Sequence, residues 1–106
     1  HVLGSAQLFF ENEEGTLLYT GDFKRRQGLS SEVAETCPAE TLIMETTYGL
    51  PKYRFPPARE SVEQIHKFCF EALEEDETPV LLGYSLGKAQ EILSAISSGG
   101  FSIMLH

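Results

Sequence analysis

The segment from residue 79 to residue 96 constrains the fold of this chain more than any other. It begins with an apolar run at residues 79–83 and continues through a short turn into apolar residues at helical spacing up to Ile96. A short apolar run bounded by turn residues is typical of a strand covered on both faces. The segment therefore predicts a strand followed directly by a helix, the unit from which parallel α/β sheets are built.

The remaining segments extend this pattern in both directions along the chain. β-prone runs on either side of the polar turn at residues 11–15 predict an antiparallel hairpin. A strand is expected at 41–44, a helix from Val62 to Leu73 that begins with a capping box at Ser61, and a last strand at 101–105. The predicted fold class is α/β, with an antiparallel hairpin followed by a β-α-β-α-β parallel-sheet segment.

The overall charge narrows the classes of partner. The chain has 106 residues with 8 Lys and Arg against 16 Asp and Glu, which gives a formal net charge of −8. General attraction to nucleic acid or to an anionic membrane is not expected from such a chain, so any nucleic-acid contact requires a local basic patch. Lys24, Arg25 and Arg26 form the one run of consecutive basic residues.

The two cysteines and the hydropathy pattern indicate the cellular compartment in which the protein is expected. Cys37 and Cys69 are not in a C-x-x-C pattern, so neither a zinc knuckle nor a disulfide framework is indicated, and a reducing cytoplasm is expected. No apolar run approaches the roughly 18 residues of a membrane span. His1 and the apolar run before His106 make both ends look cut from a longer protein.

The turn in the segment 79–96 allows three interpretations. Gly83 to Gly87 fits G-x-S-x-G, the turn that presents a nucleophilic serine in α/β hydrolases, and Ser85 would then be that nucleophile. The triad partners should follow the serine, yet only Glu91 and His106 do. A phosphate loop requires four residues between its glycines and a hydroxyl after the lysine, and Ala89 follows Lys88. Alternatively, Ser85 is a helix N-cap.

Four motifs occur in one order along nearly the whole chain: H-V-L-G-S-A-Q at residues 1–7, Y-T-G-D-F-K at 19–24, E-T-T-Y-G at 45–49 and L-G-K-A-Q-E at 86–91. In these motifs the chain resembles the metallo-β-lactamase-fold nucleases that carry a β-CASP insertion. This family includes RNA 3′-end processing endonucleases, RNase J and ligase-associated DNA exonucleases. The resemblance implies that residues 1–40 belong to the metallo-β-lactamase core and residues 41–106 to the β-CASP domain.

The resemblance also implies roles for three residues. His1 matches a histidine that ligates one of two zinc ions, and Asp22 matches an aspartate that bridges both. Imidazole nitrogen and carboxylate oxygen are zinc ligands, and paired metals suit phosphodiester hydrolysis through a metal-bound hydroxide. Glu45 matches an acidic residue that hydrogen-bonds a histidine near the leaving group, where it would orient that imidazole.

Further expectations concern nucleic-acid contacts and the remaining histidines. Lys24, Arg25 and Arg26, directly after Asp22, and Lys88 at a helix start are candidates for contacts with RNA or DNA. His66 is expected to be exposed and inert, and His106 has no assigned role. The H-x-H-x-D-H motif and the later histidines of the family are missing, so the chain supplies at most two metal ligands and should be inactive alone. A truncated serine hydrolase and a non-catalytic remnant or binding module of the same fold remain as alternatives.

Overall fold

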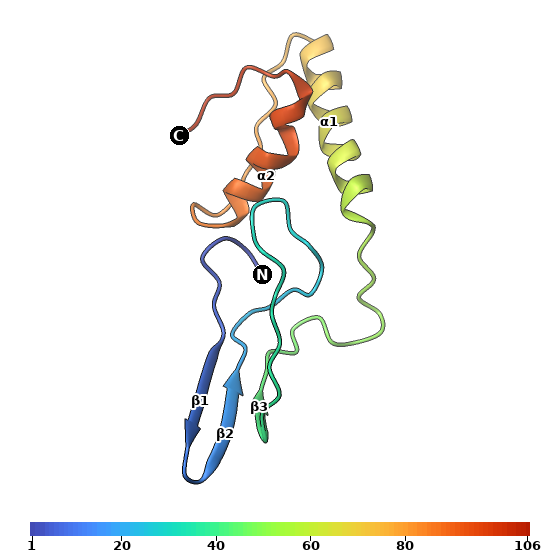
Figure 1. Cartoon of the computed structure of the whole chain (residues 1–106). Coiled ribbons are helices and arrows are strands. Elements are labelled where there is room, and N and C mark those ends of the chain that lie inside the picture. Colours follow the sequence, from blue (N-terminus) through green and yellow to red (C-terminus); the bar gives the residue numbers. More distant parts are fainter. The chain divides into compact units, whose positions relative to one another are not determined.

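The computed structural model describes residues 1–106, which form two compact units, His1–Tyr53 and Arg54–His106. The first unit contains a small β-sheet and the second contains the helices (Figure 1). No helix is long and apolar enough to cross a membrane.

The first unit is organised around a three-stranded mixed sheet. Strand β1 spans Leu8–Asn12, β2 spans Gly15–Tyr19 and β3 spans Thr41–Ile43, in the order β1-β2-β3. β1 pairs with β2 in the antiparallel sense, whereas β3 pairs with β2 in the parallel sense. The parallel pair of β2 and β3 positions the candidate site.

Polar side chains at the turn hold the sheet together at one end. The Asn12 Oδ1 accepts a hydrogen bond from the Glu14 N–H at 2.9 Å, which closes the turn between β1 and β2. Thr16 and Glu40 exchange two hydrogen bonds: the Thr16 N–H donates to Glu40 Oε2 at 2.9 Å, and the Glu40 N–H donates to Thr16 Oγ1 at 3.0 Å. This reciprocal pair brings residue 40 to β2 and so sets the start of β3.

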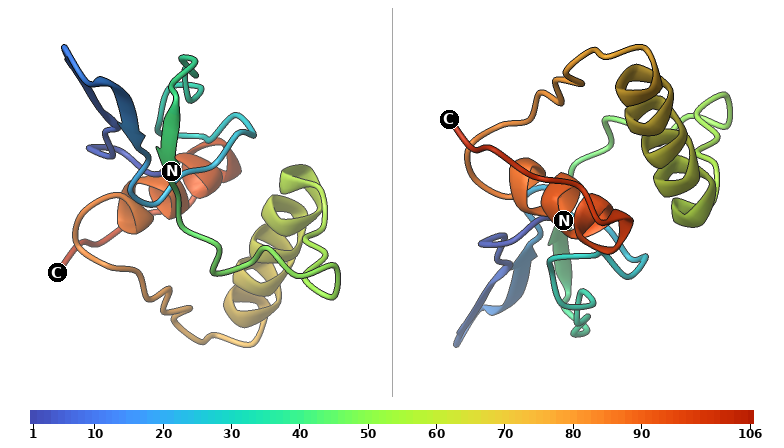
Figure 2. Two further views of the ribbon diagram at one scale, coloured as in Figure 1. Left: turned by 90° about the horizontal axis from the view of Figure 1, so that it is seen from below. Right: turned by 90° about the horizontal axis from the view of Figure 1, so that it is seen from above.

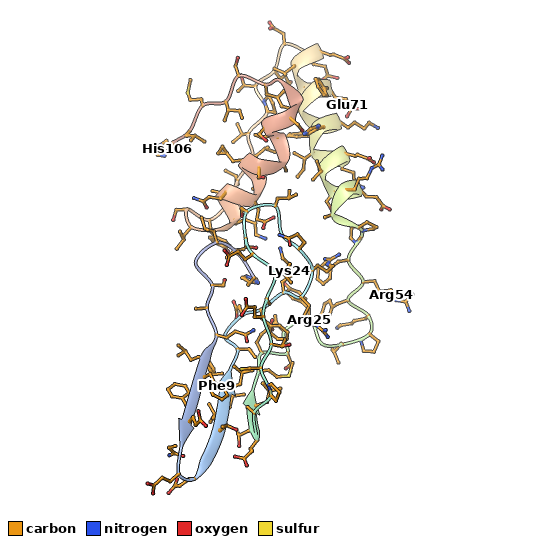
Figure 3. All side chains as sticks on the ribbon, viewed as in Figure 1. Phe9, Lys24, Arg25, Arg54, Glu71 and His106 are labelled. Carbon is orange, nitrogen blue, oxygen red and sulfur yellow. The ribbon has the colours of Figure 1, made fainter.

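The register of the sheet places one strand residue in the core. Leu18 is buried and lies directly opposite Phe9 on β1 and Leu42 on β3. Phe9, labelled in Figure 3, and Leu42 remain about half exposed at 46% and 53%. The central strand therefore supplies the buried residue of this sheet, as expected for a strand with neighbours on both sides.

The second unit contains two helices and a short 3₁₀ turn. α1 spans Ala58–Glu74, α2 spans Lys88–Ile96 and the 3₁₀ helix η1 spans Ser97–Gly99 (Figure 2). Buried Cys69 of α1 and buried Ala95 and Ile96 of α2 form the apolar core of this unit. The Phe70 and Phe101 rings pack with their centroids 4.8 Å apart.

His66 of α1 links the two helices through a hydrogen bond. His66 Nε2 lies 2.8 Å from the Ala95 carbonyl oxygen, and its ring makes edge contacts with Phe70 and Phe101. Because a carbonyl oxygen only accepts, Nε2 is the protonated nitrogen. The expectation of an exposed, inert His66 is wrong: the side chain is half-buried because it supplies a donor to a carbonyl near the end of α2.

Both helix starts differ from the sequence expectation. α1 begins at Ala58, directly after Pro57, and has no side-chain cap, so Ser61 lies inside the helix. Proline is favoured at such a start because it needs no amide partner. α2 begins at Lys88, three residues after the predicted cap Ser85, and the Gln90 Oε1 accepts from the Gly87 N–H at 2.7 Å. Ser85 is therefore not the N-cap.

The predicted parallel β-α-β-α-β segment does not form. Residues 79–83 and 101–105 lie outside any strand, and Val80, Leu82 and Met104 are exposed at 69%, 87% and 96%. A strand requires a neighbour for its backbone groups, and neither run has one. β3, expected to start this sheet, pairs with β2 in the first unit. The class remains α/β, and the division at residue 40 into two family domains stays a prediction.

Candidate active site

The three site residues predicted from the sequence, His1, Asp22 and Glu45, lie at one edge of the sheet. β2 and β3 are parallel, so their carboxyl ends meet at the same edge, where the Thr20 N–H donates to the Ile43 carbonyl at 3.0 Å. Asp22 follows β2 and Glu45 follows β3 at this edge. β1 runs antiparallel to β2, so the segment that precedes it, including His1, reaches the same edge. Loops beyond the carboxyl ends of parallel strands commonly carry binding sites.

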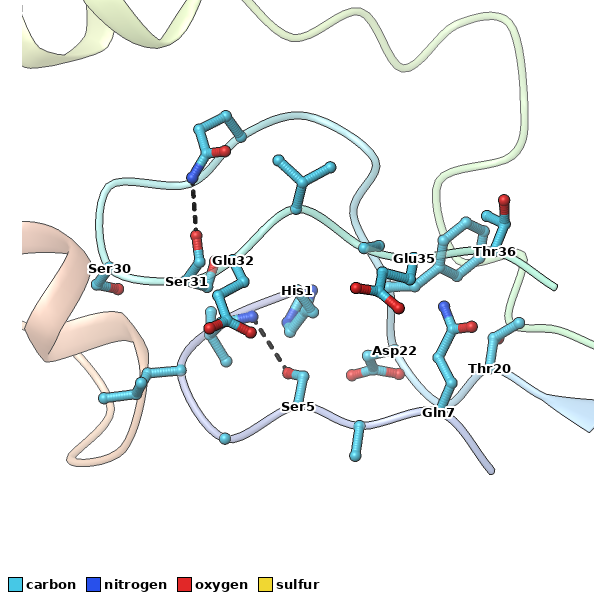
Figure 4. Close-up of a pocket in the computed structure, with 18 of the residues that line it drawn as sticks. His1, Ser5, Gln7, Thr20, Asp22, Ser30, Ser31, Glu32, Glu35 and Thr36 are labelled. Carbon is cyan, nitrogen blue, oxygen red and sulfur yellow. Dashed lines mark hydrogen bonds between the residues drawn. The ribbon is translucent and has the colours of Figure 1, made fainter. Parts of the chain in front are cut away.

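His1 and Asp22 line one pocket in the first unit. The pocket has a volume of about 1270 Å³, and the side chains of His1, Asp22 and Glu35 lie around it (Figure 4). Ser5, Gln7, Thr20, Glu32 and Cys37 are among its other lining residues. Glu45 does not line this pocket. The structure thus brings the two predicted metal ligands together and places Glu45 at the neighbouring strand end.

The turn that presents His1 explains the glycine and serine of its motif. The Val2 N–H donates to Ser5 Oγ at 3.1 Å, and the Ser5 N–H donates to the Val2 carbonyl at 3.0 Å. Gly4, between them, has a φ of 88°, a backbone conformation that side chains disfavour. The motif therefore encodes a closed turn that sets where His1 lies.

The turn after β2 presents Asp22 in a similar way. Thr20 is buried, and its hydroxyl donates to the Gly21 carbonyl at 2.7 Å. Gly21 has a φ of 54°, in the left-handed region that favours glycine. The backbone bends at Asp22, and the Asp22 side chain is exposed at the pocket.

Glu45 is held in its charged form by backbone donors. The Thr47 N–H donates to Glu45 Oε2 at 2.9 Å. Thr47 lowers the pKa of Glu45, first through this backbone bond and then through its hydroxyl. Desolvation opposes the shift, and the Phe23 N–H makes the smallest contribution, which also lowers the pKa. Because Phe23 is the residue after Asp22, Glu45 lies against the Asp22 turn. A carboxylate with a lowered pKa is an acceptor that can orient a cationic or N–H donor partner.

The donor set at the pocket fits part of a metal site. His1 offers an imidazole and Asp22 a carboxylate, both zinc ligands by chemistry. No group of three or more His, Cys, Asp and Glu side chains is arranged to hold a metal ion. The residues present therefore fit two ligands of a larger shell, and the remaining ligands would come from elsewhere.

The predicted basic residues fall in both units. Lys24 is half-buried and Arg25 is exposed on the segment directly after Asp22 (Figure 3). Arg26, the next residue, is also exposed. Lys88 is the exposed first residue of α2, in the second unit. The structure thus keeps Lys24, Arg25 and Arg26 on the Asp22 segment.

The serine-hydrolase turn is not built. Residues 79–83 form no strand, and Ser85 lies in an exposed turn where its carbonyl oxygen, at 3.4 Å, accepts from Gln90 Nε2. The strained strand-to-helix elbow that this nucleophile requires is therefore missing.

Two acidic residues at the pocket were not predicted from the sequence. Glu32 and Glu35 lie in the stretch 24–40, where only Lys24, Arg25 and Arg26 were candidates for a site, yet both line the pocket. No periodic pattern marks them, because the loop has no regular structure. Their position depends on the Thr16 and Glu40 hydrogen bonds that return the loop to the sheet.

Sequence comparison relates the chain to nucleic-acid enzymes. It is 50% identical over 107 residues to a protein named "Probable DNA ligase" from Opitutus terrae, covering all of this chain and 10% of that protein. It is 35% identical over 106 residues to an "RNase J-like protein" from Methanocaldococcus jannaschii, covering 92% of this chain and 24% of that protein. It is 34% identical over 95 residues to "Cleavage and polyadenylation specificity factor subunit 3" from Dictyostelium discoideum, covering 88% of this chain and 12% of that protein.

These relatives confirm the resemblance seen in the motifs. The chain matches a segment of each of these proteins and fits a fragment of a metallo-β-lactamase-fold nuclease of the β-CASP family. It spans between about a tenth and a quarter of the length of the relatives described above. No family model and no solved structure matches the chain.

Proposed function

We propose that this chain is part of a zinc-dependent nuclease that hydrolyses phosphodiester bonds in RNA or DNA. The observation that carries the proposal is the convergence of the His1 turn, the Asp22 turn and Glu45 at one edge of the β2–β3 pair. Relatives named as ribonucleases at 35% and lower identity support the nucleic-acid substrate, and the relative at 50% identity carries a DNA-ligase name. The proposed substrates therefore include both RNA and DNA.

His1 and Asp22 are proposed as metal ligands. Each side chain is set by its own turn, and both face the same pocket. Zinc, when bound with ligands from other parts of the protein, supplies Lewis-acid stabilisation of charge on the phosphoryl oxygens. The exposed Asp22 carboxylate suits a shared ligand because both its oxygens are available for coordination.

Glu45 is proposed as a positioning residue for a catalytic imidazole. Its carboxylate is ionised and pinned by Thr47, so its geometry does not depend on a bound substrate. An oriented carboxylate that accepts from an imidazole N–H fixes the tautomer of that ring and raises its basicity. The imidazole would then hold the proton that the leaving oxygen needs.

Lys24, Arg25, Arg26 and Lys88 are proposed as phosphate contacts. In a chain with a net charge of −8, Lys24, Arg25 and Arg26 are the cations that would attract a polyanion to the acidic pocket of the first unit, and Lys88 would contact phosphate in its own unit. Phosphate contacts position the strand without reading its sequence.

Chelation tests the proposed metal dependence. Single-stranded RNA and DNA, each labelled at one end, are incubated with the full-length protein before and after treatment with a zinc chelator. Hydrolysis of at least one strand is expected, and it should be lost on chelation and return when zinc is restored. Strand cleavage that persists unchanged in the chelator, or a zinc-loaded protein that cleaves neither strand, would contradict the proposal.

A further inference from the structure

The loop at residues 46–53, here called the aromatic loop, follows Glu45 directly and is drawn in green in Figure 1. Two turns fold it: the Gly49 N–H donates to the Thr46 carbonyl, and the Tyr53 N–H donates to the Leu50 carbonyl, both at 3.0 Å. These turns bring the rings of Tyr48 and Tyr53 together, with centroids 5.2 Å apart and planes at 86°. The loop therefore has a defined shape.

The loop holds its aromatic rings toward solvent. Tyr48 is 61% exposed and Tyr53 is 40% exposed, although an aromatic ring gains most by burying its large apolar surface. The edge-to-face contact with Tyr53 fixes the orientation of Tyr48 while leaving much of its surface uncovered. An exposed ring of fixed orientation is suited to stacking against a flat partner.

A cation completes the arrangement. Lys52 Nζ lies 5.0 Å from the centroid of the Tyr53 ring, so the ammonium group covers Tyr53 and lies within the aromatic loop. The chain as a whole is acidic, which makes a cation against one of the two paired rings a local exception. Rings beside a cation match the two parts of a nucleotide, since the base stacks and the phosphate pairs with the charge.

We propose that the aromatic loop is a stacking platform for single-stranded nucleic acid, with a base on Tyr48, a phosphate on Lys52 and Tyr53 as the support of the Tyr48 ring. This inference rests on the proposed nuclease function and names the form of its substrate. Two residues separate Tyr48 from Glu45, so their Cα atoms lie within about 11 Å of each other. The platform thus holds an unpaired strand beside the proposed reaction edge.

Binding to uncleavable single strands tests the platform. The full-length protein is titrated with fluorescent phosphorothioate oligothymidylate and oligouridylate of about 12 nucleotides. Tyr48→Ala should weaken binding of the strand that the protein prefers by roughly 5- to 100-fold, and Tyr48→Phe should stay within about twofold because the ring is kept. Tyr84→Ala, which removes an 84% exposed tyrosine of the other unit, is the matched control and should bind normally.

Two further variants test the role of Lys52 and control for effects on folding. Lys52→Ala should reduce the slope of log affinity against log salt by about 0.7, whereas Lys67→Ala on α1 should not. Tyr48→Leu keeps an apolar side chain without a ring, so it should bind as weakly as Tyr48→Ala with an unchanged urea midpoint. Normal binding by Tyr48→Leu or by Tyr48→Ala would overturn the platform alone. Failure of the unmodified protein to bind either strand would overturn the nuclease proposal as well.

Discussion

At the scale of single residues, Glu45 combines a charge with a fixed geometry. Its Oε2 accepts from the Thr47 N–H at 2.9 Å, and the same backbone donor is the main cause of its lowered pKa. The sequence motif predicted a role for Glu45 but not its neighbours. Its approach to Phe23 joins segments 22 residues apart, and local patterns carry no information on such a contact.

Replacing Glu45 with glutamine separates positioning from metal binding. Glu45→Gln in the full-length protein should keep its zinc and fold but lower the rate of phosphodiester hydrolysis by roughly 10²-fold or more, because an amide orients an imidazole N–H less strongly. Rate and zinc content are measured on the same sample. A near-normal rate would reduce Glu45 to a loop residue, and lost zinc would make it a ligand.

The same variant has a signature in acid. A group with a lowered folded-state pKa stabilises the fold above its unfolded pKa, and this stabilisation is lost as the pH falls through the folded value. For Glu45 the loss is expected below roughly pH 4.5. Urea unfolding midpoints between neutral and acid pH should therefore fall less steeply in Glu45→Gln than in the unmodified protein.

At the scale of elements, the start of α2 is set by a residue inside the helix. Gln90 reaches back to the Gly87 N–H at 2.7 Å, while Ser85 contributes only its backbone carbonyl. The sequence offered serine as the better known cap, but the helix begins too late for Ser85 to reach its first free N–H groups. The helical spacing of apolar residues predicted that the helix exists. Its first residue depends on whether Ser85 or Gln90 supplies the cap.

Gln90→Ala tests the start of α2. Loss of the accepting amide oxygen leaves the part-buried Gly87 N–H without this partner and should lower the free energy of unfolding by about 0.5–1.5 kcal/mol. Ser85→Ala is the matched control and should change it by less than about 0.5 kcal/mol. Urea unfolding followed by circular dichroism measures both. A larger cost for Ser85→Ala than for Gln90→Ala would restore Ser85 as the cap.

At the scale of the whole molecule, the sequence predicted local elements better than their pairing. The antiparallel β1–β2 pair and both helices lie where β-prone runs and helical spacing indicate them. The partner of β3 could not be predicted, because pairing with β2 depends on the long return through residues 24–40 and on the Thr16 and Glu40 contact. The exposed runs at 79–83 and 101–105 show that an apolar pattern alone does not form a strand without a neighbour.

For the candidate site, too, the residues were predicted but their arrangement in space was not. His1, Asp22 and Glu45 were predicted because their motifs resemble those of a known family, and each lies in a short segment with hydrogen bonds from its own serine or threonine residues. Their meeting at one edge required the parallel register of β2 and β3, in which Tyr19 lies opposite Ile43. The sequence pattern instead predicts Asp22 after the hairpin and Glu45 in a separate parallel sheet.

The central claim is that this edge carries part of a metal centre, and Asp22→Asn tests it most directly. Elemental analysis and phosphodiester hydrolysis are measured on the full-length protein, the Asp22→Asn variant and an Asp76→Asn control. Asp76 has a φ of 59°, a conformation that asparagine also adopts, and lies in the other unit. We expect about two zinc ions in the unmodified protein and the control, with both zinc content and rate reduced in Asp22→Asn. Full zinc content and a normal rate in Asp22→Asn would contradict the account.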